Sequence, residues 1–194
     1  LITGATSGIG LNFVKQFYEQ HEITVICRNK EKGLQLKSKY NIKILNADLS
    51  DNNQIMDCFY KCDESYDILI NNAGMCATKK MVKFKDKTIN KCLMVNLIAP
   101  YIFTEYMCKN KKVKKVITVN SITHWIGSYP KPNDTFQQAY ANSKLSLMSL
   151  HTYWNMKYSD IKFVSINPGY VDTGIWYPNA PGERIHKHLR KIFA

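Results

Sequence analysis

Short apolar segments alternate with amphipathic segments along this chain, and this alternation is the strongest constraint on its fold. The predicted strands are 23–27, 42–45, 67–70, 116–119 and 162–166, and the predicted helices are 9–20, 30–39, 53–61, 87–109 and 136–158. The strands are nearly continuously apolar, which is typical of strands covered on both faces in a parallel sheet. Repeated strand–helix–strand order therefore predicts a doubly wound α/β domain with a mostly parallel sheet and helices on both faces.

The 194 residues predict one domain, 1–194, because no linker, internal repeat or low-complexity stretch divides them. A composition with 45% hydrophobic and 22% charged residues is that of a globular chain and excludes general disorder. No run approaches the roughly 18 apolar residues that a membrane span requires. The chain opens at Leu1-Ile2-Thr3, within what reads as the end of a strand, so we expect further residues to precede it.

Lysine dominates the charge of the chain, which is +12 from 27 Lys and Arg against 15 Asp and Glu. Much of the excess lies in 79–91 and 109–115. Such a charge suits nucleic acid, an anionic membrane or an anionic ligand, or simply a solvated face, and we favour the solvated face because no nucleic-acid motif is present. The six cysteines are scattered, with no Cys-x-x-Cys pair, and no histidine has metal-ligand spacing. We therefore expect free thiols, a reducing compartment and no metal site.

A glycine-rich turn links the first strand to the first helix. Glycines at such a turn let backbone N–H groups approach a pyrophosphate, and the N-terminus of the helix adds a favourable dipole, as in Rossmann-like folds. An ordinary glycine turn is the alternative interpretation. The residues that we expect to hold a dinucleotide here are Thr3, Gly4, Thr6, Ser7, Gly8, Ile9 and Gly10.

The ends of the next two strands bear on the choice of dinucleotide. The second strand ends in Arg28-Asn29, without the carboxylate that accepts hydrogen bonds from the ribose of NAD. Arginine accommodates the 2′-phosphate of NADP, so we expect NADP(H) rather than NAD(H), unless Arg28 is only a surface charge. Asp48-Leu49 follows the third strand and could bind the adenine amino group, while a helix N-cap at Asp48 or Ser50 is the alternative.

Tyr140 and Lys144 lie four residues apart in a predicted helix and therefore share one face. A fixed ammonium beside a phenol, whose ordinary pKa is about 10, favours the phenolate and brings acid–base chemistry closer to neutral pH. Ser121 follows a predicted strand at the edge where doubly wound sheets place ligands. Asn96 lies inside a predicted helix, where asparagine is unfavourable unless its side chain has a partner.

Together these features resemble the short-chain dehydrogenase/reductase family, from Leu1 to about Trp176. The resemblance rests on five motifs in the family's order: Thr3-Gly4-x-x-x-Gly8-Ile9-Gly10, Asn71-Asn72-Ala73-Gly74, Asn96, Ser121 with Tyr140-x-x-x-Lys144, and Pro168-Gly169. It implies hydride transfer between NADP(H) and a carbonyl or alcohol carbon. It also implies that the cofactor is bound by Asn72, Ala73, Gly74, Tyr140, Lys144, Pro168, Gly169, Val171 and Thr173.

The resemblance also assigns catalytic roles. Tyr140 is the general acid or base, and Lys144 lowers its pKa and holds the nicotinamide ribose. Ser121 binds the substrate oxygen, and Asn96 supports a water-mediated proton relay to Lys144. The alternative is a non-catalytic nucleotide sensor or partner-binding protein on the same fold, against which the intact Ser121, Tyr140 and Lys144 argue.

Cys27-Arg28-Asn29 and the segment 119–124 resemble the retinol-dehydrogenase-like branch, although Asn120 stands where a second serine is common. That branch implies a carbonyl reductase or alcohol dehydrogenase for a lipophilic substrate such as a retinoid, steroid, fatty aldehyde or quinone. It implies a cytoplasmic or cytosol-facing protein and leaves open a homodimer and contact with a membrane. The resemblance also predicts a further strand and helix after 194.

Two groups of residues carry open alternatives. The basic segment 186–191 either faces water, which we favour, or lies on an anionic membrane. The other group forms either an apolar substrate wall or plain core, and it comprises Trp125, Ile126, Tyr129, Trp176 and Tyr177.

Overall fold

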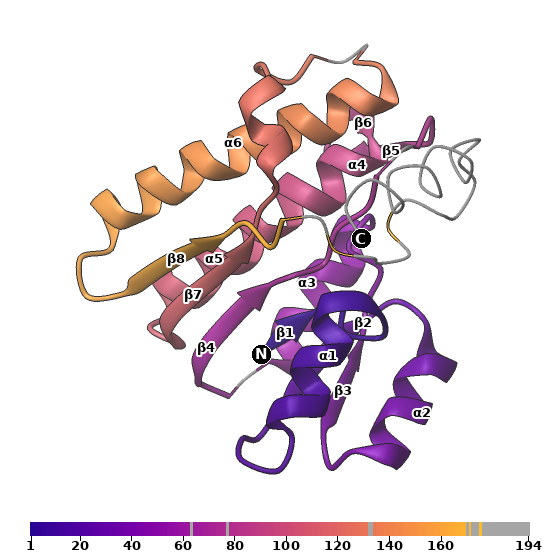
Figure 1. Cartoon of the computed structure of the whole chain (residues 1–194), viewed down its shortest axis with the longest axis vertical. Helices are drawn as coiled ribbons and strands as arrows, with labels where there is room; N and C mark the ends of the chain where they lie inside the picture. The colour runs from indigo at the N-terminus through magenta and orange to yellow at the C-terminus, as the bar shows by residue number, and fades with distance from the viewer. Residues whose placement is uncertain (63, 77, 132–133, 170, 172–174, 176–194) are drawn as a thin grey trace.

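The computed structural model describes residues 1–194 except 63, 77, 132–133, 170, 172–174 and 176–194. Its centre is a six-stranded parallel sheet in the order β3-β2-β1-β4-β7-β8 (Figure 1), which confirms the predicted doubly wound, Rossmann-like fold. The strands of this sheet are β1 (Ile2–Thr3), β2 (Thr24–Cys27), β3 (Lys43–Asn46), β4 (Tyr66–Asn71), β7 (Val113–Val119) and β8 (Lys162–Ile166).

Helices pack on both faces of this sheet. Helices α1 (Gly8–Phe17) and α2 (Lys30–Lys39) enclose one apolar core, and α3 (Asn52–Lys61), α5 (Ala99–Lys109) and α6 (Phe136–Lys157) enclose the other. This division follows from right-handed crossovers, because the connections run toward one edge of the sheet as far as β3 and toward the other edge afterwards. Among the described residues, no helix combines the length and apolarity needed to cross a membrane.

The segment before α5 differs from the prediction. We predicted a helix from Lys87, but β5 (Met81–Phe84) and β6 (Lys87–Asn90) form an antiparallel hairpin. A helix begins only with α4 (Lys91–Leu93), followed by a π-helical segment η1 (Met94–Ile98) that leads into α5.

The alternation of side chains along the hairpin explains this correction. Val82, Phe84 and Ile89 pack against the core, whereas Lys83 and Thr88 between them are exposed. This period of two satisfies a strand that is buried on one face, and a helix would scatter the same apolar residues around its circumference.

Candidate active site

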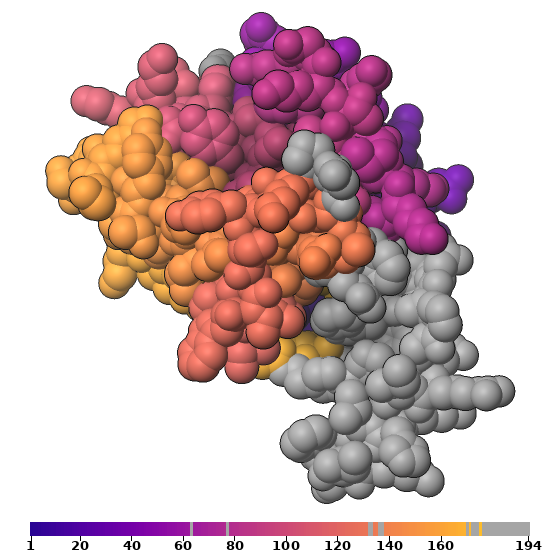
Figure 2. Space-filling view, turned by 90° about the horizontal axis from the view of Figure 1, so that it is seen from above, coloured from indigo at the N-terminus to yellow at the C-terminus, as the bar shows by residue number. Residues whose placement is uncertain are grey.

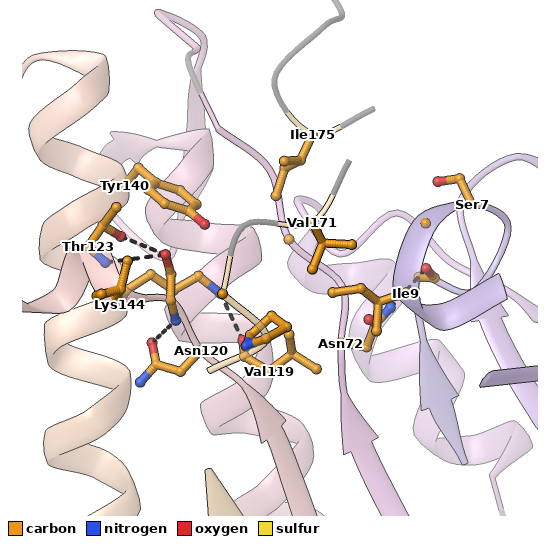
Figure 3. A pocket seen from close by; sticks show the side chains of 17 residues that line it. Ser7, Ile9, Asn72, Val119, Asn120, Thr123, Tyr140, Lys144, Val171 and Ile175 are labelled. Atoms are coloured by element: carbon orange, nitrogen blue, oxygen red, sulfur yellow. Dashed lines mark hydrogen bonds between the residues drawn. The ribbon is translucent and has the colours of Figure 1, made fainter. Parts of the chain in front are cut away.

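A cavity of about 420 Å³ lies at the carboxyl edge of the parallel sheet, between the segments that follow β1, β4, β7 and β8 (Figure 3). In Figure 3, Ser7, Ile9 and Asn72 lie on one side of the cavity, and Tyr140 and Lys144 lie on the other. The predicted site residues that line it are Gly4, Ser7, Gly8, Ile9, Asn72, Gly74, Ser121, Tyr140, Lys144, Pro168, Gly169 and Val171.

Hydrogen bonds tie the glycine loop after β1 to the segment after β4. Asn72 Nδ2 donates to the carbonyl oxygens of Thr3 at 2.9 Å and Gly4 at 3.0 Å, and Thr3 Oγ1 accepts from the backbone nitrogen of Ala73 at 3.0 Å. Gly4 has a left-handed φ of 69°, and a Cβ there would lie 2.7 Å from Ala73 Cα. The loop is therefore held close to its neighbour with bare backbone toward the cavity, which fits the pyrophosphate of a dinucleotide.

Gly10 provides a direct test of this close packing. A Cβ at this position would lie 2.5 Å from Asn72 Nδ2 and 2.8 Å from Ala5 Cα. We expect Gly10→Ala to lower the free energy of unfolding by about 1–3 kcal/mol, as overpacking in a core does, and to weaken dinucleotide binding. Urea denaturation measures the first effect.

Gly74→Ala is the matched control, because a Cβ at Gly74 has only ordinary contacts, none closer than 3.7 Å. Equal stability of the two variants would contradict the tight packing inferred at Gly10.

The tyrosine and the lysine come from α6, which begins with a capping box between Thr135 and Gln138. Tyr140 is 6% exposed, directs its hydroxyl group into the cavity (Figure 3) and forms a hydrogen bond with Ser121. Lys144 is 4% exposed and donates from Nζ to the carbonyl oxygen of Val119 at 2.9 Å. Its Nζ lies 5.8 Å from the centre of the Tyr140 ring.

Burial controls the ionisation of both groups. Burial raises the pKa of Tyr140 above its ordinary value of 10.0, although the hydrogen bond from Ser121 acts in the opposite direction. Burial lowers the pKa of Lys144 from 10.5 to about 8. The lowering of the Tyr140 pKa that we predicted from Lys144 is therefore not found, because burial is the largest cause and raises that pKa. At neutral pH the phenol is protonated and suited to act as an acid.

Ser121 is oriented by its position at the start of a short helix. It is the N-cap of the 3₁₀ helix η2 (Ile122–Ile126), and its Oγ accepts from the backbone nitrogen of Thr123 at 3.3 Å and from Thr123 Oγ1 at 3.0 Å. Asn120 Oδ1 accepts from the backbone nitrogen of Ser121 at 2.9 Å. The hydroxyl of Ser121 is thus fixed beside that of Tyr140, where two donors can meet one substrate oxygen.

We predicted that the side chain of Asn96 has a partner, and it bonds to the backbone of Met75 and to the side chain of Ser143. Asn96 Oδ1 accepts from the nitrogen of Met75 at 2.8 Å, and Nδ2 donates to the oxygen of Met75 at 2.9 Å and to Ser143 Oγ at 3.2 Å. Asn96 is fully buried within η1 and does not line the cavity. Its described contacts are those of a brace between η1 and α6, and the proton-relay role stays a prediction.

The residues predicted to bind the adenosine end lie outside the cavity wall. Arg28 is exposed after β2, and Asn29 caps α2 by accepting from the nitrogen of Lys32 at 2.8 Å. Leu49 is buried in the core. The structure therefore leaves Arg28 accessible and gives Asn29 and Leu49 structural contacts.

Asp48 is not a helix cap, and neither is Ser50. The cap of α3 is Asp51, whose side chain accepts from the backbone nitrogens of Asn53 and Gln54, so the alternative of an N-cap at Asp48 or Ser50 is wrong. Asp48 instead accepts from Ser50 Oγ at 2.7 Å. Burial acts to raise the pKa of Asp48, but the hydrogen bonds from Ser50 and the positive charges of Lys91 and Arg28 together outweigh it, and the pKa is lowered.

Several predicted residues do not meet in the cavity. The ones outside its wall are Thr3, Thr6, Gly10, Arg28, Asn29, Asp48, Leu49, Ala73 and Asn96, and Thr173 lies outside the described residues. The expected aromatic wall also differs: Trp125, Ile126 and Tyr129 are exposed and do not line the cavity. Trp176, Tyr177 and the segment 186–191 lie outside the described residues.

The apolar lining comes from residues that the sequence did not single out. Ile122, Val171 and Ile175 take the place of the predicted aromatic wall, Val171 having been expected only as a cofactor contact. Val119, Asn120 and Thr123 complete the strand-end segment around Ser121. The neighbours of Ser121 could have been predicted from their position in the sequence, because residues next to Ser121 at the end of a strand lie at the same edge of the sheet.

The fold and this cavity define a dinucleotide-binding α/β domain with an acid–base pair at its carboxyl edge. A family model described as short chain dehydrogenase matches residues 1–183. A 3-oxoacyl-[acyl-carrier-protein] reductase from Buchnera aphidicola subsp. Baizongia pistaciae is 30% identical over 205 residues, which cover 99% of this chain and 80% of the relative. The chain belongs to the short-chain dehydrogenase family.

Solved structures agree with this assignment. A 4-hydroxyisoleucine dehydrogenase complexed with NADH is 26% identical, with a TM-score of 0.77 over 98% of this chain and 81% of the other. A short-chain dehydrogenase from Sphingobium yanoikuyae in complex with NADPH shares the fold, at 22% identity and a TM-score of 0.68 over 90% and 72% of the two chains. The chain is thus an oxidoreductase of the hydride-transfer class that uses a nicotinamide cofactor.

Proposed function

We propose that this protein transfers hydride reversibly between NADP(H) and a carbonyl or alcohol carbon of a small lipophilic substrate. The observation that carries the proposal is the hydrogen-bonded pair of Ser121 and Tyr140, which faces the glycine loop across one cavity. A bound nicotinamide cofactor supplies or accepts the hydride. The residues that would hold it are those of the glycine loop together with Asn72, Pro168, Gly169 and Val171.

The protein's own residues provide the proton and the orientation. In the direction of reduction, Ser121 and Tyr140 donate hydrogen bonds to the carbonyl oxygen, and Tyr140 delivers the proton as charge develops on that oxygen. In the direction of oxidation, Tyr140 takes the proton from the alcohol. We assign to Lys144 the binding of the nicotinamide ribose and the electrostatic support of the phenolate that forms.

The substrate class follows from the lining of the cavity. Ile122, Val171 and Ile175 offer an apolar surface near the Ser121–Tyr140 pair, which favours a lipophilic carbonyl compound such as a retinoid, steroid, fatty aldehyde or quinone. The named relative acts on 3-oxoacyl groups of a carrier protein, and a 3-oxoacyl thioester is therefore the rival substrate within the same chemistry.

A substrate screen tests this proposal. The purified protein is supplied with NADPH or NADH and one compound of each class above, including a 3-oxoacyl thioester, and consumption of the reduced cofactor is followed by fluorescence. We expect turnover with at least one lipophilic carbonyl compound. A folded protein that binds neither cofactor, or turns over none of the compounds, would favour the non-catalytic alternative.

Arg28 is the residue on which we base the preference for NADP(H). It is exposed at the end of β2, next to the cap of α2, where its guanidinium group can reach a 2′-phosphate. Arg28→Ala should raise the Kd for NADPH by about tenfold or more, since a hydrogen bond to a charged group contributes about 1.5–3 kcal/mol, and should leave the Kd for NADH unchanged. Fluorescence titration at fixed ionic strength measures both constants.

Lys37→Ala removes an equal charge from the far end of α2 and is the control. If it weakened NADPH binding as much as Arg28→Ala, the preference would come from general charge and not from a specific contact.

A further inference from the structure

The loop between η2 and α6 is fastened to α6 by the side chain of Asn142. Asn142 Oδ1 accepts from the backbone nitrogen of Ser128 at 2.6 Å, and Nδ2 donates to Asp134 Oδ2 at 2.6 Å. The same carboxylate oxygen of Asp134 accepts from the backbone nitrogen of Lys131 at 3.0 Å. One amide on the helix therefore bonds to both ends of the loop.

Asn142 is buried, so its side-chain amide needs hydrogen-bond partners within the protein. Asn142 is 2% exposed in the interior of α6, where asparagine is a poor helix former and where an unsatisfied amide is costly. Its side chain bonds to Ser128 and Asp134, both on the loop.

Close packing at Gly127 reinforces the same contact. A Cβ at Gly127 would lie 2.6 Å from the carbonyl oxygen of Ala141 and 2.9 Å from Leu145 Cβ. Figure 2 shows the salmon to orange part of the chain, around residues 120–150, gathered on one face of the molecule. The chain at the end of η2 is therefore held against α6 at two neighbouring positions, Ala141 and Asn142.

This contact affects the catalytic pair because η2 runs from Ser121 to Gly127, where the chain packs against α6. Ser121 caps the first turn of η2. The contacts of Gly127 and Ser128 with α6 fix the last turn of η2 to the helix that carries Tyr140. We infer that Asn142 is a positioning residue that sets the distance between the hydroxyl groups of Ser121 and Tyr140. The inference rests on the proposed function only for its catalytic consequence.

The inference is tested by removing the donor from the Asn142–Asp134 hydrogen bond and then restoring the bond with its polarity reversed. Asn142→Asp places a second carboxylate 2.6 Å from that of Asp134, which repels the loop at neutral pH. We expect faster hydrogen exchange of the amides in 122–128 and an upward shift of the Tyr140 pKa, because the hydrogen bond from Ser121 lowers that pKa. The Tyr140 titration is isolated by tyrosinate absorbance, as the difference between each protein and its Tyr140→Phe counterpart.

Activity and cofactor binding give the second readout. For Asn142→Asp we expect kcat/KM to fall by about tenfold or more, as for misplacement of a catalytic donor, while the Kd for NADPH changes by less than about twofold. The double variant Asn142→Asp with Asp134→Asn restores a donor opposite the new carboxylate. It should recover the exchange protection, the Tyr140 titration and most of the activity.

Two outcomes overturn the inference. One is an unchanged Tyr140 titration and unchanged exchange of 122–128 in Asn142→Asp. The other is a double variant that is as stable as the parent protein but does not recover. Exchange and titration need no substrate, so an absence of activity in the parent protein would refute the proposed function and leave the positioning role to be judged by those two readouts.

Discussion

Tyr140→Phe is expected to lower kcat/KM by about 10²–10⁴-fold and to leave cofactor binding intact. The magnitude is that of a lost general acid or base. The phenyl ring keeps the packing of Tyr140, which lies in an apolar cluster with Cys92, Leu93 and Ala139, so the fold and the glycine loop should be unaffected. Steady-state kinetics with the substrate found in the screen, together with NADPH titration, measure the two effects.

Tyr153→Phe is the matched control, because Tyr153 lies on the same helix but is 44% exposed. Turnover by Tyr140→Phe at the parental rate would remove the tyrosine from the mechanism. If the protein is instead a nucleotide sensor on this fold, Tyr140→Phe should leave its partner activity unchanged.

Lys144→Met is expected to make the protein more stable while abolishing efficient turnover. Burial lowers the pKa of Lys144 from 10.5 to about 8, so the charged form is disfavoured in the folded state. At about 1.4 kcal/mol per pKa unit this costs up to about 3 kcal/mol at neutral pH. The variant loses the hydrogen bond to Val119, worth about 1 kcal/mol, so we expect a net gain of about 2 kcal/mol.

The pH dependence of this gain has a definite sign. Between pH 8 and pH 10.5 the unfolded chain binds more protons at Lys144 than the folded protein does, so the cost of the lysine diminishes as pH rises through this window. The advantage of Lys144→Met should therefore be largest below about pH 8 and shrink above it. Urea denaturation at several pH values measures it, with Lys109→Met, at an exposed position, as the control. A variant less stable than the parent at pH 7 would contradict the burial cost.

The sheet and the Tyr140–Lys144 pair could be predicted because both depend on local spacing. Apolar runs of strand length specify a covered parallel sheet, and a separation of four residues places two side chains on one helical face. The hairpin was missed because Lys87 and Lys91, four residues apart, also fit the polar face of a helix, and only packing on the core decides between the two patterns.

The pKa direction of Tyr140 and the role of Asn142 could not be read from spacing. The first depends on burial, which is the largest cause of the raised pKa, and burial is a tertiary property. The role of Asn142 could have been suspected in the same way as that of Asn96, because asparagine is unfavourable inside a helix unless its side chain has a partner. Their partners lie on loops outside their own helices, and no helical spacing rule identifies which loop residues these are.

The tie between Thr3 and the segment after β4 has a consequence for folding. It joins residues 70 positions apart, so the glycine loop reaches its final form only after β4 has paired with β1. On a chain emerging from the ribosome, the nucleotide-facing half can close before α6 has been made. The acid–base helix is then added to a preformed half, and slow closure of this first long loop would delay the whole site.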